Sequence, residues 1–399
     1  MLKRATMSAV PAHPVAATPT GSFPPMAFAS RMDKAREATS RLGCAALVVT
    51  CLVNVRYLTG FSGSAGLLVL SEDGAVLLTD GRYATQAPAE VERSGSPVRV
   101  EAVPGPAQAG VLAELVVAAT SGGAGRVGLE AEHVSWARRR SYGDAWGPRC
   151  TLVPTTGVVE RLRERKEPSE VTRVRAAAAV ADAALEGCLA MLREHPTEAE
   201  VAAALDGEMR RLGAEAPAFE TIVAAGAAAA EPHHRPGRHT VAPGDLVVLD
   251  FGARVEGYCS DMTRTVRAGE GPGGAGVALT GELRRMVSVV QASQDAGLSA
   301  VRAGVPAAEV DRACREVVGA AGWAERFVHG TGHGVGLEVH EAPSLGASSE
   351  DILSPGQVVT VEPGVYIPGL GGARTEDTVV VTEDGCELLT LAPKYQPTP

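Results

Sequence analysis

Acidic residues end or interrupt apolar, strand-like segments in the C-terminal half of this chain. Asp250 closes an apolar run, Asp261 follows the next turn, and Glu362 and Glu376 occupy similar places farther along. A carboxylate in such a segment is costly to bury unless an opposite charge or a bound cation accompanies it. These acids therefore constrain the fold, because it must gather them around positive charge.

Two hairpins are expected to present these acids in pairs. With a tip at residues 255–256, the first hairpin places Asp250 opposite Asp261, with β-carbons about 4.5 to 5.5 Å apart. Glu362 and Glu376 repeat this arrangement around the Pro-Gly-rich turn that separates them. Two carboxylates at so short a distance both remain ionised at neutral pH only when a metal neutralises them. Without a metal, they share a proton.

A histidine lies in a glycine-rich segment between the two hairpins. His333 ends the stretch His329-Gly-Thr-Gly-His333, in which the missing side chains let the imidazole approach a site closely. Four carboxylates and one neutral imidazole carry four negative charges, which two divalent ions balance. Taken singly, each acid is more commonly a turn or capping residue, but the combination favours a dinuclear centre. Its oxygen-rich ligands favour Mn²⁺, with Co²⁺, Fe²⁺ and Zn²⁺ as alternatives.

Composition argues against several other kinds of protein. The formal charge of −10 and the isoelectric point near 5.5 disfavour a nucleic-acid or anionic-membrane partner. No segment approaches the roughly 20 apolar residues of a membrane span. Seven scattered cysteines without a CxxC pair are typical of a reducing compartment, so a soluble, cytoplasmic protein is expected. Residues 1–30, broken by prolines, are predicted to form a disordered tail.

The pattern of elements divides the rest of the chain in two. From residue 31 to residue 160, short β-branched runs alternate with helical stretches, which is typical of a small α/β domain. From residue 161 to residue 399, the order of helices, strands, helices and strands predicts an α+β domain with a largely antiparallel sheet. Thr197 and Glu200 form a capping-box pattern at the start of one of its helices.

At the four acidic residues and His333, the chain resembles the pita-bread metallopeptidases, which include methionine aminopeptidase, aminopeptidase P, prolidase and the metal-free creatinase. In the N-terminal part, Asn54-Val-Arg-Tyr57-Leu-Thr-Gly-Phe61 and Thr79-Asp-Gly-Arg-Tyr83 resemble the creatinase-type domain of the proline-specific branch. Methionine aminopeptidases lack that domain. The resemblance implies an α+β pita-bread catalytic domain with an antiparallel sheet, preceded by a smaller α/β creatinase-type domain.

The resemblance also implies a role for each candidate ligand. Asp250 chelates one metal, Asp261 and Glu376 bridge both, and His333 and Glu362 complete the second. A water or hydroxide between the ions is the implied nucleophile, because metal binding lowers the pKa of water toward neutrality. Glu362 is the implied general base for attack on the carbonyl carbon before proline.

Further residues match positions that contact the substrate or support the ligands. His233 is expected to hydrogen-bond the oxyanion, His340 to assist departure of the proline nitrogen, and His329 to line the proline pocket. Taken alone, each is more commonly a structural residue or a surface group, which is the interpretation given to His234 and His239. The groups expected to support metal carboxylates through hydrogen bonds are Arg374, Tyr258 and Asp377.

The predicted activity is hydrolysis of the Xaa-Pro bond at the N-terminus of short peptides, as in aminopeptidase P. A strict Xaa-Pro dipeptidase, or prolidase, is the alternative, but it needs a cation for the proline carboxylate, and residues 342–354 contain no Arg or Lys. A metal-free creatinase-like hydrolase and a non-catalytic binding module are less favoured, since neither gains from crowded carboxylates. By analogy with relatives, a homodimer or homotetramer is expected.

Overall fold

The computed structural model describes residues 23–120, 125–147, 149–269, 279 and 281–394. Residues 1–22 of the expected disordered tail lie outside these ranges, but the tail does not extend to residue 30, because helix α1 (Phe28–Arg41) begins before that point. The residues just before α1 are held in place by Arg173. Its guanidinium stacks on the ring of Phe23 and donates a hydrogen bond of 3.0 Å to the Pro24 carbonyl.

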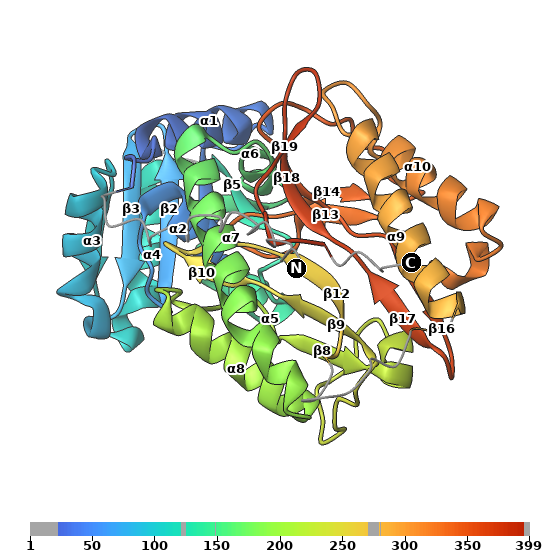
Figure 1. The fold of residues 1–399 in the computed structure, drawn as a ribbon. Coiled ribbons are helices and arrows are strands. Elements are labelled where there is room, and N and C mark those ends of the chain that lie inside the picture. The colour runs from blue at the N-terminus through green and yellow to red at the C-terminus, as the bar shows by residue number, and fades with distance from the viewer. Residues whose placement is uncertain (1–22, 121–124, 148, 270–278, 280, 395–399) are drawn as a thin grey trace, which may run out of the picture.

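The N-terminal part is a mixed sheet between two layers of helices (Figure 1). Its strands, in spatial order, are β4 (Arg99–Ala102), β3 (Gly74–Thr79), β2 (Gly66–Ser71), β1 (Ala46–Val49), β5 (Gly125–Glu130) and β6 (Cys150–Thr155). Its helices are α1, α2 (Leu52–Thr59), α3 (Gln86–Ser94), α4 (Gly105–Ala119) and α5 (Trp136–Trp146), with a short 3₁₀ helix η1 (Gly81–Tyr83). Alternate residues of β1 face opposite layers, because Leu47 packs with α1 and α2 whereas Val48 packs with α4 and α5.

The C-terminal part contains short antiparallel sheets covered by helices. Its first strands are β7 (Ala216–Pro217), β8 (Ile222–Ala225), β9 (Leu246–Phe251), β10 (Ala253–Val255), β11 (Tyr258–Cys259) and β12 (Met262–Arg267). Its later strands are β13 (Gly332–Gly334), β14 (Glu341–Leu345), β15 (Val358–Val361), β16 (Gly364–Ile367), β17 (Gly371–Arg374), β18 (Asp377–Val381) and β19 (Cys386–Leu388). Every pair described among them is antiparallel, so the predicted α+β class is confirmed.

The helices of this part lie in two groups on the outside of the strands (Figure 1). They are α6 (Glu160–Glu164), α7 (Pro168–Cys188), α8 (Glu198–Arg211), α9 (Gly281–Ala300) and α10 (Ala307–Ala320), with η2 (Leu189–Arg193), η3 (Gly226–Ala230) and η4 (Ala324–Arg326). Helices α7 and α8 share one core with β8, β9 and β12. Helices α9 and α10 share another with β15 to β18. Two of the candidate ligands, Asp250 and His333, lie on the strands of this part, and the other three lie in the short segments that join them.

The predicted capping box at the start of α8 is confirmed. The Thr197 hydroxyl accepts a hydrogen bond from the Glu200 amide at 3.3 Å, and the Glu200 carboxylate accepts one from the Thr197 amide at 2.7 Å. These bonds satisfy amides that have no partner inside the helix. None of the described helices is both long enough and apolar enough to span a membrane.

Candidate metal centre

The first acidic hairpin differs from the predicted one by its register. Its tip is Glu256-Gly257, and β9 pairs with β12 so that Asp250 lies opposite Thr263. The prediction that Asp250 lies opposite Asp261 is therefore wrong by two positions. Both tip residues have positive φ, of 50° and 82°, which a β-branched residue such as Val255 avoids and glycine permits. The two acids still lie on one face of the hairpin, on a diagonal.

The second acidic hairpin has the predicted register. Gly364 pairs with Arg374 on one side, and Val361 pairs with Asp377 on the other. Between these two pairs, the same register places Glu362 directly across from Glu376.

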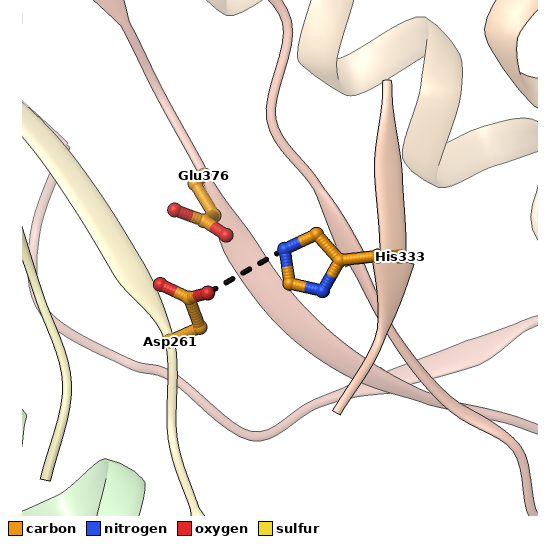
Figure 2. A group of neighbouring side chains, drawn as sticks. All are labelled: Asp261, His333 and Glu376. Carbon is orange, nitrogen blue, oxygen red and sulfur yellow. Dashed lines mark ion pairs between the residues drawn. The ribbon is translucent and has the colours of Figure 1, made fainter. Parts of the chain in front are cut away.

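The two hairpins and His333 converge between the two cores, and Figure 2 shows Asp261, His333 and Glu376 directed toward one another. One potential ligand atom from each of these three residues lies within 4.8 Å of the others. The Nε2 atom of His333 lies 3.5 Å from a carboxylate oxygen of Asp261 and 3.2 Å from one of Glu362. The fifth candidate, Asp250, accepts a hydrogen bond of 2.5 Å from Arg374.

Two carboxylate oxygens at the centre of this cluster lack partners. Asp261 Oδ1 and Glu376 Oε1 are buried and have no hydrogen bond within the part of the chain that the structure describes. Burial, and then the neighbouring carboxylates, raise the pKa of both residues well above the ordinary values. A divalent cation supplies the missing partner and removes the repulsion, so the residues present fit a metal site.

His333 is oriented to offer a ring nitrogen to that site. Its Nδ1 lies 3.0 Å from the Gly334 carbonyl, which can only accept, so Nδ1 carries the proton and Nε2 faces the carboxylates. Burial opposes the charged form of Glu362, but while no cation is bound, the hydrogen bond and the charge of a protonated His333 lower its pKa to about 2. Glu362 is therefore ionised at neutral pH.

Arg374 contacts one candidate ligand directly and a second one through Thr263. Its guanidinium donates to Asp250 and, at 3.0 Å, to the Thr263 hydroxyl. That hydroxyl in turn donates to Glu376 at 2.7 Å. Thr263 was missed by the sequence analysis, although the correct hairpin register would have placed it beside Asp250.

The two other groups expected to support ligands, Asp377 and Tyr258, differ in their contacts. Asp377 accepts hydrogen bonds from Arg264 at 2.7 Å and Gln294 at 2.8 Å, and Arg264 also donates to the Glu376 carbonyl. Asp377 thus fixes the backbone next to Glu376. Tyr258 does not support a ligand, because its hydroxyl donates to Glu170 on α7 at 2.8 Å.

The candidate substrate-side histidines lie around the cluster. The ring of His340 is 4.3 Å from that of His333, centroid to centroid. His233 follows Pro232, whose carbonyl accepts from Arg374 at 3.3 Å. His329 has both ring nitrogens engaged, with the Gly330 carbonyl at 2.7 Å and the Tyr366 hydroxyl at 2.8 Å.

The two histidines interpreted as structural or surface residues lie on the loop that carries His233. His234 contacts the carboxylates of Glu198 and Glu231 at 2.9 and 3.1 Å. His239 is exposed, and its carbonyl accepts from the Glu198 amide at 3.0 Å. His234 thus makes structural contacts through its ring, whereas His239 lies at the surface.

Both parts of the chain match known protein families. Residues 172–383 match the model of metallopeptidase family M24, and residues 31–165 match the creatinase/prolidase N-terminal domain. The chain belongs to metallopeptidase family M24. This confirms the predicted resemblance and fold class, and it makes the chain a peptidase for which divalent metal ions are implied.

Several family M24 relatives are similar over nearly the whole chain. The uncharacterized peptidase YqhT of Bacillus subtilis is 38% identical over 91% of this chain and 98% of its own length. Among solved structures, an Xaa-Pro dipeptidase from Bacillus anthracis has a TM-score of 0.84 and 35% identity, covering 92% of this chain and 99% of its own. An X-Pro aminopeptidase from Thermotoga maritima has a TM-score of 0.80 and 34% identity, covering 90% and 98%.

Removing divalent ions from this M24 peptidase with a chelator is expected to lower its melting temperature by roughly 5 °C or more. A cation at about a hundred times its Kd stabilises the folded state by about 2.7 kcal/mol. Differential scanning fluorimetry with and without added Mn²⁺ measures the shift. In Asp261→Asn most of the shift should disappear, whereas an equal shift in both proteins would place the bound ion elsewhere.

Proposed function

We propose that Asp250, Asp261, His333, Glu362 and Glu376 hold two divalent ions, in the first instance Mn²⁺, and that the enzyme hydrolyses Xaa-Pro bonds at the N-terminus of short peptides. The observation that carries this proposal is the pair of buried, unpartnered oxygens on Asp261 and Glu376, two residues that cluster with His333. The names of the similar solved structures, Xaa-Pro dipeptidase and X-Pro aminopeptidase, support the choice of substrate.

Ions bound there supply Lewis acidity that polarises the scissile carbonyl and acidifies water. The residues of the chain then move protons and orient the peptide. Glu362, ionised at neutral pH, accepts the proton of the attacking water. His340 assists the transfer of that proton to the departing proline nitrogen, a role supported by its exposed ring, which makes no hydrogen bond within the described residues.

The remaining two histidines act on the substrate in different ways. His233 hydrogen-bonds the developing oxyanion from its place on the rim of the cluster. His329 lines the proline pocket with the faces of its ring, because both of its nitrogens are already engaged.

We assign the aminopeptidase P type of action, in which peptides longer than Xaa-Pro are accepted. In β14, the residue paired with His333 is the uncharged Ser344. Two arginines of the N-terminal part are engaged elsewhere, since Arg56 lies 3.7 Å from Glu215 and Arg82 lies 2.7 Å from Asp80. These contacts support a site without a fixed cation for the carboxylate of a dipeptide.

A strict Xaa-Pro dipeptidase is the second candidate. The similar structure from Bacillus anthracis carries that name, and prolidases from Pyrococcus furiosus and Pyrococcus horikoshii are also similar in fold, at 30% and 28% identity. On this alternative, a cation outside residues 342–354 would bind the proline carboxylate.

Comparing kcat/KM for an Xaa-Pro dipeptide and an Xaa-Pro-Xaa tripeptide separates the two candidates. The tripeptide is expected to be cleaved at least as well as the dipeptide. A dipeptide preference above about a hundredfold, equivalent to about 2.7 kcal/mol, would establish the dipeptidase instead. Ser344→Arg serves as a matched variant, because a cation opposite His333 should shift the preference toward the dipeptide.

The metal and the assembly are proposed by analogy with relatives. We propose a cytoplasmic homodimer or homotetramer that binds two ions per chain. Metal analysis of the purified protein and its mass in solution test these statements, and absence of stoichiometric metal would favour a creatinase-like hydrolase or a binding module.

A further inference from the structure

A buried arginine connects the N-terminal part of the chain to the segment that ends in His340. Arg163, on helix α6, is only 3% exposed. One of its nitrogens donates to the Asn54 side chain at 2.8 Å, and another donates to Glu338 and Glu341, each at 2.6 Å. A guanidinium held at several points in this way has a fixed position.

Both carboxylate oxygens of Glu341 accept hydrogen bonds. One oxygen accepts from Arg163 and from the Glu338 amide at 3.0 Å, and the other accepts from Lys166 at 3.0 Å. A β-carbon added at Gly336 would lie 2.5 to 2.8 Å from this carboxylate, so the turn of residues 336–341 wraps closely around it. Moving the carboxylate therefore moves the turn.

On its other side, Arg163 is anchored to the N-terminal sheet. The side chain of Asn54, which accepts from Arg163, donates to Glu130 at 2.8 Å. Glu130 ends strand β5 and accepts hydrogen bonds from the Cys51 amide at 2.8 Å and the Thr50 hydroxyl at 2.9 Å. The contacts run without a break from this sheet to Glu341.

His340 depends on this anchor for its position. It is the residue directly before Glu341, and its ring packs 4.3 Å from the ring of His333. Within the described residues no hydrogen bond holds the His340 ring itself. The position from which its side chain starts is set by the backbone, which Glu341 fixes where β14 begins.

We propose that Arg163 is a positioning residue for His340, acting through Glu341, so that the N-terminal part of the chain completes the active site of the same chain. The inference rests on the proposed role of His340 in proton transfer. If the network only joined the two parts of the chain, its loss would lower stability without a specific effect on the step that His340 assists.

Arg163→Gln is expected to lower kcat at least about tenfold, because a misplacement of about 1 Å in a reacting group can cost a hundredfold. KM should change less than about threefold, and metal content should stay at the wild-type value. Glu341→Gln and Gly336→Ala perturb the same anchor and should have the same signature. Arg161→Gln, on the exposed side of the same helix, is the matched control and should leave kcat unchanged.

The deciding measurement repeats these substitutions in His340→Ala. If the anchor acts through His340, each of these substitutions should lower kcat less than about twofold when His340 is already replaced. Equal losses in both backgrounds would overturn the positioning role, as would loss of metal. Should Arg163→Gln fail to fold, Gly336→Ala decides the question. An unchanged kcat in His340→Ala alone would instead contradict the proposed function of His340.

Discussion

Replacing Asp261 by Asn, or Glu376 by Gln, is expected to lower peptide hydrolysis by about a thousandfold or more and to remove bound metal. Each substitution keeps the shape of the side chain but removes one of the charges that neutralise the cations. The affected oxygens have no other partner within the described residues, so nothing compensates for the loss. A thousandfold decrease corresponds to about 4 kcal/mol of lost transition-state stabilisation.

Metal content and kcat/KM should be measured on the same preparations of both variants. Asp384→Asn is a matched control, because Asp384 is an exposed acid in the turn after β18. It should retain both properties. Wild-type metal content and turnover in Asp261→Asn and Glu376→Gln would rule out a metal site at this cluster.

The second large effect is expected for His340→Ala, which should lower kcat at least about a hundredfold while the metals stay bound. His340 contacts the ring of His333 but is not expected to be a ligand, so its loss removes help with proton transfer to the proline nitrogen. Metal analysis together with steady-state kinetics distinguishes the loss of proton transfer from the loss of a metal ligand.

His239→Ala provides the comparison for this variant, because His239 is exposed and was interpreted as a structural or surface residue. Its kcat should remain within about twofold of the wild-type value. Loss of metal in His340→Ala would show that the residue acts on the centre itself, and its role in proton transfer would then be wrong.

Local patterns in the sequence predicted most of the fold. The alternation of short apolar runs with helical stretches indicated the α/β layer, and the capping box of Thr197 and Glu200 marked the start of α8. Both depend on neighbouring residues along the chain, which the sequence displays directly. The cost of burying carboxylates also predicted that Asp261, Glu376 and His333 would meet, as they do (Figure 2).

The sequence did not determine the register of the first hairpin. A tip one residue earlier than the true Glu256-Gly257 turn changes every cross-strand partner by two positions. The predicted partner of Asp250 was therefore Asp261, and Thr263 was overlooked. The second hairpin was predicted correctly, because its Pro-Gly-rich turn leaves less freedom in placing the tip.

By itself, the sequence determined which residue types must gather and in which elements they lie, because burial cost and periodicity act over short stretches of chain. Only the tertiary structure decided which side chains far apart in the sequence meet one another. Arg163 meets Glu341 across 178 positions, and Tyr258 meets Glu170 across 88. Such contacts depend on how whole elements pack, and a buried polar side chain bonds whichever partner that packing brings within reach.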